Sequence, residues 1–358
     1  MKTHTHKPIT SFVDGEVARG AWREEIIAPE ISGVARPITV FRAQRTSKLI
    51  TYDWHGDAST FCPPMWWDLG IGSGACNFQC RSCFLLLTFR AMRDPHRHVL
   101  YENVEDFVRA TEHWLIDPTR RRQHTLGVGI DRSDSLLYEG VTGHVRRLAP
   151  LFADLTVNQR ANKLILLTKS ANTHYLADVA PEHRRQVVVT FSLNPEAVAD
   201  AWEGKWDDGV RITPPISKRL EAARYAQDLG YEVRVRVDPI LTIPNWEEHY
   251  ADFVAQVKAA GINFRYWTLG TYREKNTQLD GWRERWQLPA MEWQPDEGEL
   301  VKEGTHRHLP EARRIEIYTT VRDLIAREFP RGRASLCKET HSVRKALRLC
   351  NADCNCLV

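Results

Sequence analysis

Three cysteines lie within eight residues, in the segment Cys76-Asn-Phe-Gln-Cys80-Arg-Ser-Cys83. Thiols with three and then two residues between them can converge on one small inorganic group. A tetrahedral zinc ion would want a fourth ligand nearby, and none follows Cys83 closely. A [4Fe-4S] cluster contains four irons, so three thiolates leave one iron open for a substrate or cofactor. The spacing therefore favours such a cluster over zinc and over three unrelated thiols.

The composition limits the classes of protein that fit this chain. Its 358 residues exceed one average domain, although an α/β barrel reaches this length. The 49 basic residues nearly balance 46 acidic ones, which argues against a protein that coats a polyanion. Seven of the eight cysteines fall at two sites and no signal peptide precedes them, so we expect metal binding in a reducing cytoplasm. No apolar run approaches the roughly 18 residues of a membrane span.

The hydrophobic pattern alternates between strands and helices from residue 66 onward. Segments 68–72, 125–130, 163–168, 186–191, 232–237 and 264–269 predict strands, and the stretches between most of them predict helices, with a last long helix over 312–329. Such alternation predicts a parallel sheet with right-handed crossovers. We expect an α/β fold, a partial (βα)6 barrel over residues 66–335. Residues 1–65, strand-like only at 38–41 and 48–51, would form an N-terminal extension, and residues 336–358 a cysteine-rich tail.

Polar residues follow the predicted strands, where the chemistry of a barrel gathers. They are Asp131, Ser133 and Asp134; Thr168 and Lys169; Ser192 and Asn194; Asp238; and Thr271, Tyr272 and Arg273. By strand alternation, Arg236 and Asp238 share one face, which is either the barrel lumen or an exposed, salt-bridged surface.

The other cysteines leave alternatives open. Cys62 is a hydrogen-atom donor, an extra ligand or a plain buried thiol. Four cysteines near the C-terminus suit one complete site, either an auxiliary iron–sulfur cluster or structural zinc, with His341 as a substitute ligand. They are Cys337, Cys350, Cys354 and Cys356.

Several segments, taken in order, resemble the spore photoproduct lyase branch of the radical S-adenosylmethionine (SAM) proteins over roughly residues 66–340. They are the cysteine motif, Thr168-Lys169, Val189-Thr-Phe-Ser-Leu-Asn194, Pro214-Pro215, Lys218-Arg-Leu-Glu-Ala-Ala223, Asp238-Pro-Ile240 and Trp246-Glu-Glu248.

The resemblance implies an enzyme whose [4Fe-4S] cluster, bound by Cys76, Cys80 and Cys83, cleaves SAM to a 5′-deoxyadenosyl radical. It implies Lys169, Ser192 and Asn194 as SAM contacts, with the Asp131–Asp134 loop near the methionine amine. If the strand face opens to the lumen, Arg236 and Asp238 would hold SAM's carboxylate and a ribose hydroxyl. A reductant such as flavodoxin or ferredoxin would supply the electron, and the substrate would be a nucleobase, nucleotide or nucleic acid.

The chain departs from that branch at the residues that relay hydrogen. Where the lyase has a tyrosine between the second and third cysteines and another after the third, this chain has Ser82 and Phe84. Asp131 takes the place of the hydrogen-donating cysteine. We therefore expect the same radical to act on another substrate. Radical tailoring of a peptide or small metabolite, and a zinc-stabilised nucleic-acid-binding protein without turnover, are the alternatives.

Overall fold

The computed structural model describes residues 23–31, 34–35, 37–46, 48–53, 66–73, 76, 78, 80–83, 98–120, 123–130, 133–205, 209–274, 292–303 and 306–349. Among these residues, none of the helices combines the length and the apolar character that crossing a bilayer requires.

The centre of the molecule is an eight-stranded sheet in the order β17-β13-β12-β11-β10-β9-β6-β5. Seven of its strands are parallel, and β5 (Ile50–Asp53) pairs with β6 in the antiparallel sense. The parallel strands are β6 (Trp66–Leu69), β9 (Thr125–Val128), β10 (Lys163–Thr168), β11 (Val187–Ser192), β12 (Glu232–Ile240), β13 (Tyr266–Thr271) and β17 (Arg333–Leu336).

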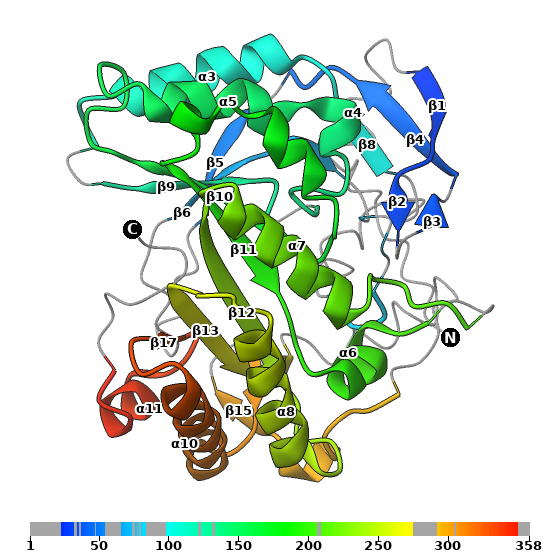
Figure 1. Ribbon diagram of the computed structural model, residues 1–358, viewed down its shortest axis with the longest axis vertical. Helices are drawn as coiled ribbons and strands as arrows, with labels where there is room; N and C mark the ends of the chain where they lie inside the picture. The colour runs from blue at the N-terminus through cyan, green and yellow to red at the C-terminus, as the bar shows by residue number, and fades with distance from the viewer. Residues whose placement is uncertain are drawn as a thin grey trace, which may run out of the picture.

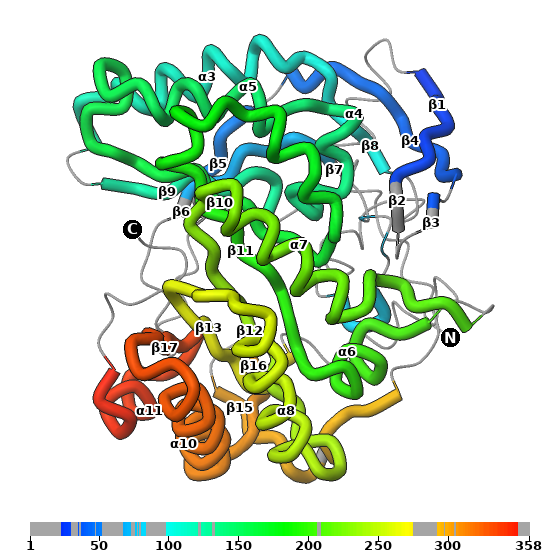
Figure 2. The backbone as a smooth tube through the Cα atoms, in the orientation of Figure 1, coloured from blue at the N-terminus to red at the C-terminus, as the bar shows by residue number. Residues whose placement is uncertain are grey.

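The parallel strands follow one another across the sheet in chain order, which Figure 2 shows as a progression of colour from blue through green and yellow to red. Because right-handed crossovers between successive neighbours place their helices on the same face, this order curls the sheet into a partial barrel. The predicted α/β fold and its six parallel strands are confirmed. The seventh parallel strand, β17, was not predicted.

Helices form the outer layer of the barrel (Figure 1). They are α3 (Val104–Ile116), α4 (Glu139–Thr142), α5 (His144–Ala153), α6 (Glu196–Glu203), α7 (Ile216–Asp228), α8 (Trp246–Ala259), α10 (Glu311–Glu328) and α11 (His341–Ala346). Short 3-10 turns occur at His174–Asp178, Pro181–His183 and Glu297–Glu299. Each long helix buries the apolar side chains along one of its faces; in α8 these include Tyr250, Phe253, Val254 and Val257.

A second sheet of four strands, in the order β1-β4-β8-β7, is built largely from the N-terminal region. Its strands are β1 (Arg23–Ile27), β4 (Ile38–Ala43), β7 (Gly72–Ser73) and β8 (His98–Tyr101). Smaller sheets join β2 (Glu30–Ile31) with β3 (Val34–Ala35), and β14 (Arg273–Glu274) with β16 (His306–His308) and β15 (Val301–Glu303). Both strand-like segments predicted before residue 65 form strands, β4 and β5. The division of the chain into three parts stays a prediction.

The core between α3 and α5 contains a histidine with an unusual environment. His144 is fully buried, its ring meets Phe107 edge to face at 5.5 Å between centroids, and neither ring nitrogen has a hydrogen-bond partner among the described residues. Burial, with a smaller contribution from the charge of Arg42, lowers the pKa of His144 to about 4. The folded state therefore holds this imidazole neutral.

We expect this histidine to make the fold acid-sensitive. Since the folded pKa lies below the unfolded value, the unfolded chain binds the additional proton first, and stability falls as the pH falls below about 6.5. Between about pH 7.5 and about pH 5 the loss is about 2 kcal/mol. His144→Leu should remove that part of the loss, measured by urea unfolding at both pH values. His113→Leu, at an exposed position on α3, should leave the loss unchanged; an equal effect of both variants would contradict the assignment.

Candidate functional site

The three closely spaced cysteines come together in one apolar cluster. Cys80 is buried, and the half-buried Cys76 and Cys83 pack against the same group of side chains. The described residues of the cysteine loop (residues 76–83) thus pack against apolar walls formed by three parts of the fold: the second sheet, the segment after β9 and the segment before α7. The apolar residues of these walls are Ile27, Val40, Leu100, Leu137, Tyr138 and Ile212, with Phe78 from the loop itself.

The donor set here is three cysteine thiols, which suits an iron–sulfur cluster. Burial raises the pKa of the Cys76 thiol well above its usual value, and the carboxylate of Asp134 adds to the rise. Burial also raises the pKa of Cys80. Iron binding would convert the thiols to thiolates and release their protons. Among the described residues, no group of three or more His, Cys, Asp and Glu side chains is arranged to hold a metal ion.

The cysteine loop is fastened to the end of helix α6 through Arg81. Its backbone N–H donates to the carbonyl of Glu203 at 3.0 Å, and its Nη2 donates to the carbonyl of Lys205 at 3.0 Å. Gly204, between these two acceptors, has a φ of +90°, and a Cβ there would lie 2.5 Å from the Cδ and Nε of Arg81. Only glycine combines this backbone angle with such a close approach.

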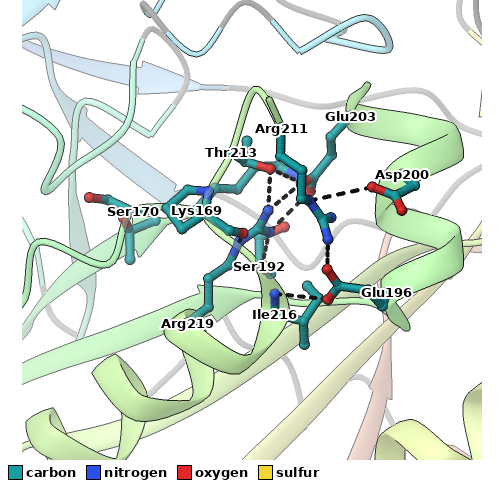
Figure 3. A network of polar contacts seen from close by, with 12 residues as sticks. Lys169, Ser170, Ser192, Glu196, Asp200, Glu203, Arg211, Thr213, Ile216 and Arg219 are labelled. Atoms are coloured by element: carbon teal, nitrogen blue, oxygen red, sulfur yellow. Dashed lines mark hydrogen bonds and ion pairs between the residues drawn. The ribbon is translucent and has the colours of Figure 1, made fainter. Parts of the chain in front are cut away.

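Glu203, the last residue of α6, is the centre of a buried ionic network (Figure 3). Its carboxylate accepts hydrogen bonds from Lys169, Thr213 and both terminal nitrogens of Arg219. Arg219 is fully buried and also donates to the carbonyls of Pro214 and Ser192, at 2.9 and 3.1 Å. Although burial opposes its ionisation, the charges of Arg219 and Lys169 hold the pKa of Glu203 well below its usual value.

The ends of β9 and β10 are joined by the carboxylate of Asp134. One of its oxygens accepts from the hydroxyl of Thr168 at 2.7 Å and from two backbone N–H groups at 3.0 Å, and the other accepts from the backbone N–H of Lys169 at 2.6 Å. Its neighbour Ser133 has a buried hydroxyl without a hydrogen-bond partner among the described residues. The predicted SAM contacts Ser133 and Lys169 therefore lie at adjacent strand ends.

The next two strands place further predicted residues at the same edge. Ser192 ends β11, and the amide oxygen of Asn194 accepts from the hydroxyl of Tyr250 at 3.1 Å. Both residues are buried, and the backbone N–H of Leu193 between them donates to the carbonyl of Arg236 in β12. The predicted set thus follows the carboxyl ends of neighbouring strands β9 to β12.

Asp238, Arg236 and Arg273 form a second buried ionic group beside Cys337. Both guanidiniums donate to the Asp238 carboxylate at 2.8–3.0 Å. Burial opposes ionisation of Asp238, but Arg273 and Arg236 outweigh it and hold its pKa well below the usual range. The Cys337 sulfur, directly after β17, accepts from Nη2 of Arg236 at 2.8 Å. This face of β12 is therefore mostly buried rather than an exposed, salt-bridged surface.

Several predicted residues cannot be placed in this arrangement. Cys62, Asp131, Cys350, Cys354 and Cys356 lie outside the described residues, as does Phe84. The structure therefore brings together the three cysteines of the loop, while Cys337 is described without the other cysteines of the predicted C-terminal site.

Sequence reasoning missed Glu203, whose carbonyl anchors the cysteine loop, and its buried partner Arg219. They lie on helices α6 and α7, among other charged residues of the same kind, so their sequence context resembles a solvated helix face. A possible signal is Gly204 directly after Glu203, because a glycine past a helix end marks a turn that brings the chain back. Arg273 was noted only as part of a polar strand end.

The packing of Arg81 against Gly204 gives a test of the loop's anchorage. We expect Gly204→Ala to lower the iron and sulfide content after anaerobic reconstitution, because the new Cβ displaces Arg81 and with it Cys80. Gly230→Ala is the matched control: φ is +92° there, and nothing lies within 4 Å of a Cβ. The control carries only the strain of the left-handed backbone, about 1 kcal/mol, and should retain its iron. Equal iron content in both variants would contradict the anchoring role.

Comparison with known proteins shows the family of this chain. The family model described as spore photoproduct lyase matches residues 59–265, more than half of the chain. Spore photoproduct lyase of Bacillus subtilis (strain 168) is 25% identical over 185 residues, which are 52% of this chain and 49% of that protein. The match thus spans about half the length of this curated relative.

Solved structures show the same fold. Spore photoproduct lyase complexed with dinucleoside spore photoproduct matches with a TM-score of 0.66 at 18% identity, over 83% of this chain and 82% of the other. A mutant of the lyase with bound AdoMet and dinucleoside spore photoproduct matches with a TM-score of 0.63 at 18% identity, over 82% and 80% of the two chains. The chain belongs to the spore photoproduct lyase family, a branch of the radical SAM enzymes.

Proposed function

We propose that this protein binds a [4Fe-4S] cluster through Cys76, Cys80 and Cys83 and uses SAM to generate a radical that abstracts hydrogen from a nucleobase, nucleotide or nucleic acid. The observation that carries the proposal is that Cys80 lies in one apolar cluster and that Cys76 and Cys83 pack against the same cluster. When bound, such a cluster supplies the electron that splits SAM into methionine and a 5′-deoxyadenosyl radical. A low-potential donor such as flavodoxin or ferredoxin would deliver that electron.

The residues at the strand ends would bind SAM and orient it. Lys169 has a side chain that is a quarter exposed and an ammonium group that pairs with Glu203, and Ser133 offers a hydroxyl without a partner among the described residues. These groups suit the carboxylate and amine of an amino acid. Asp134 has both oxygens occupied by hydrogen bonds within the protein, so its role in the proposal is to hold Lys169 and the segment after β9 in place. Ser192, Asn194, Arg236 and Asp238 complete the proposed set.

The apolar walls of the cysteine loop would serve the chemistry by excluding water. A carbon radical abstracts hydrogen from the nearest donor, so its surroundings must present the substrate and little else. Tyr138 and Ile212 contribute to these walls and are buried. These side chains would not react themselves; they would help to position the reactants and to shield them from water.

A row of aromatic rings supports a nucleobase as the substrate. Trp202 precedes Glu203 on α6, and its ring meets that of Tyr272 at 5.7 Å between centroids. Tyr272 in turn meets Trp293 at 6.4 Å. Trp202 and Trp293 are half-buried, so each keeps some ring surface in contact with solvent. Aromatic surfaces of this kind stack bases of any sequence. The relatives bound to a dinucleoside point to the same class.

The predicted second metal site and the cytoplasmic location remain part of the proposal. The tail would hold an iron–sulfur cluster or zinc through its cysteines, and Cys337 is the one that the structure describes. Its thiol already accepts hydrogen bonds from Arg236 and, at 3.7 Å, from Arg273. Metal and sulfide analysis of the full chain beside a chain truncated before Cys337 would decide whether the tail binds metal.

Removing the three thiolates should abolish SAM cleavage. We expect the triple variant Cys76→Ala, Cys80→Ala and Cys83→Ala to bind no cluster and to form no 5′-deoxyadenosine above background. The measurement is anaerobic reduction with SAM, followed by mass spectrometry, with and without candidate nucleosides, oligonucleotides and peptides. Before this comparison is made, the reconstituted wild-type protein should show the broad visible absorption of an iron–sulfur cluster. Production of 5′-deoxyadenosine by the triple variant would refute the proposed role of the loop.

The lyase reaction itself should be slow or absent. Ser82, Phe84 and Asp131 stand where the lyase branch has two tyrosines and a cysteine, and neither a phenyl ring nor a carboxylate relays a hydrogen atom as a phenol or thiol does. We expect no efficient conversion of dinucleoside spore photoproduct to thymines, measured by chromatography under reducing, anaerobic conditions beside a known lyase. Rapid, catalytic conversion would require another donor, with Cys62 the first to test.

A further inference from the structure

Three charged side chains are joined where the cysteine loop meets the end of helix α6. Lys169, Glu203 and Arg219, called here the charge triad, are joined by direct ion pairs (Figure 3). Two cations and one anion leave the charge triad with a net charge of +1. The backbone connects it directly to the loop, because Arg81, next to Cys80, donates its N–H to the carbonyl of Glu203 at 3.0 Å.

Burial makes these charges effective at a distance. The side chain of Glu203 is 3% exposed and that of Arg219 is fully buried. Water and salt therefore screen them far less than they screen charges on the surface.

The same charges act on any group whose charge changes at the loop. One-electron reduction adds one negative charge to an iron–sulfur cluster held by the three thiolates. A nearby cation stabilises the reduced form and raises the reduction potential, whereas a nearby anion does the opposite. Glu203 and Lys169 contact each other, yet they must shift the potential in opposite directions.

We propose that the charge triad sets the reduction potential of the cluster, with the buried carboxylate of Glu203 lowering it and Lys169 raising it. The inference rests on the proposed function, because it requires the cysteine loop to hold the cluster. Glu203 is on this view a positioning and electrostatic residue rather than a catalytic one. Its carboxylate keeps Lys169 and Arg219 beside the loop and limits how easily the cluster accepts an electron.

The test is a redox titration of reconstituted protein without SAM, with dithionite as the one-electron reductant and electron paramagnetic resonance as the readout. Glu203→Gln removes the anion, and we expect the ratio of reduced to oxidised cluster at a fixed potential to rise about tenfold, which is about 59 mV for one electron. Lys169→Met removes a cation, and we expect a fall of similar size. A purely structural role would not produce shifts of opposite sign.

Glu232→Gln is the matched control. Glu232 is also a largely buried glutamate, and it pairs with Lys163 at 2.5 Å and Arg234 at 2.6 Å, but it begins β12 and so lies at the opposite end of the sheet. Its replacement should leave the potential unchanged. Shifts of the same sign in the two triad variants, or shifts no larger than that of the control, would overturn the proposal.

Two outcomes separate this inference from the proposed function. If wild-type protein reconstitutes no cluster, the proposed function fails and the inference fails with it. If the wild type binds a cluster and cleaves SAM but the potentials do not move as stated, only the inference fails. Should Glu203→Gln not fold, the Lys169→Met titration decides alone, because Lys169 is a quarter exposed and its long side chain is replaced by one of similar length.

Discussion

Burying the carboxylate of Glu203 is the constraint on which the arrangement of the site depends. A lone buried carboxylate costs several kcal/mol, so the fold must supply partners. It supplies Arg219 from α7, Lys169 from the end of β10 and Thr213 from the segment between α6 and α7. Those partners fix two helices and one strand end at a single point. Because the backbone of Glu203 also anchors Arg81, the cysteine loop is positioned by the same contacts.

The barrel was predictable because its signals are local. The strand predicted over residues 163–168 is β10 with the same bounds, and its apolar run is buried on both faces of the sheet, as parallel strands require. The strand β17, in contrast, has only four residues, Arg-Ala-Ser-Leu, and follows a glycine that reads as the end of a helix. Its place beside β13 is determined by long-range pairing, which no local pattern records.

The positions of the candidate site residues were predictable to the extent that the sheet topology determines them. Ser133, Lys169, Ser192 and Asp238 were chosen as residues at strand ends, and the parallel sheet necessarily brings such ends to one edge. Glu203 and Arg219 come from helices and reach the site through their side chains. Whether a helical glutamate faces water or an arginine on the next helix depends on how the helices pack, and that information is absent from the spacing of residues along either helix.

The pairing of β13 with β17 also has a consequence for the synthesis of the protein. β13 is buried along its whole length, and the aromatic rings of Phe253, Phe264 and Phe329 surround its Trp267. Its outer edge is covered by β17, which follows β13 in the chain and is therefore synthesised after it. Until then the nascent chain carries an apolar strand with open hydrogen-bonding groups, a surface on which chains aggregate. Chains that terminate just before β17 would keep this edge open and are therefore expected to aggregate.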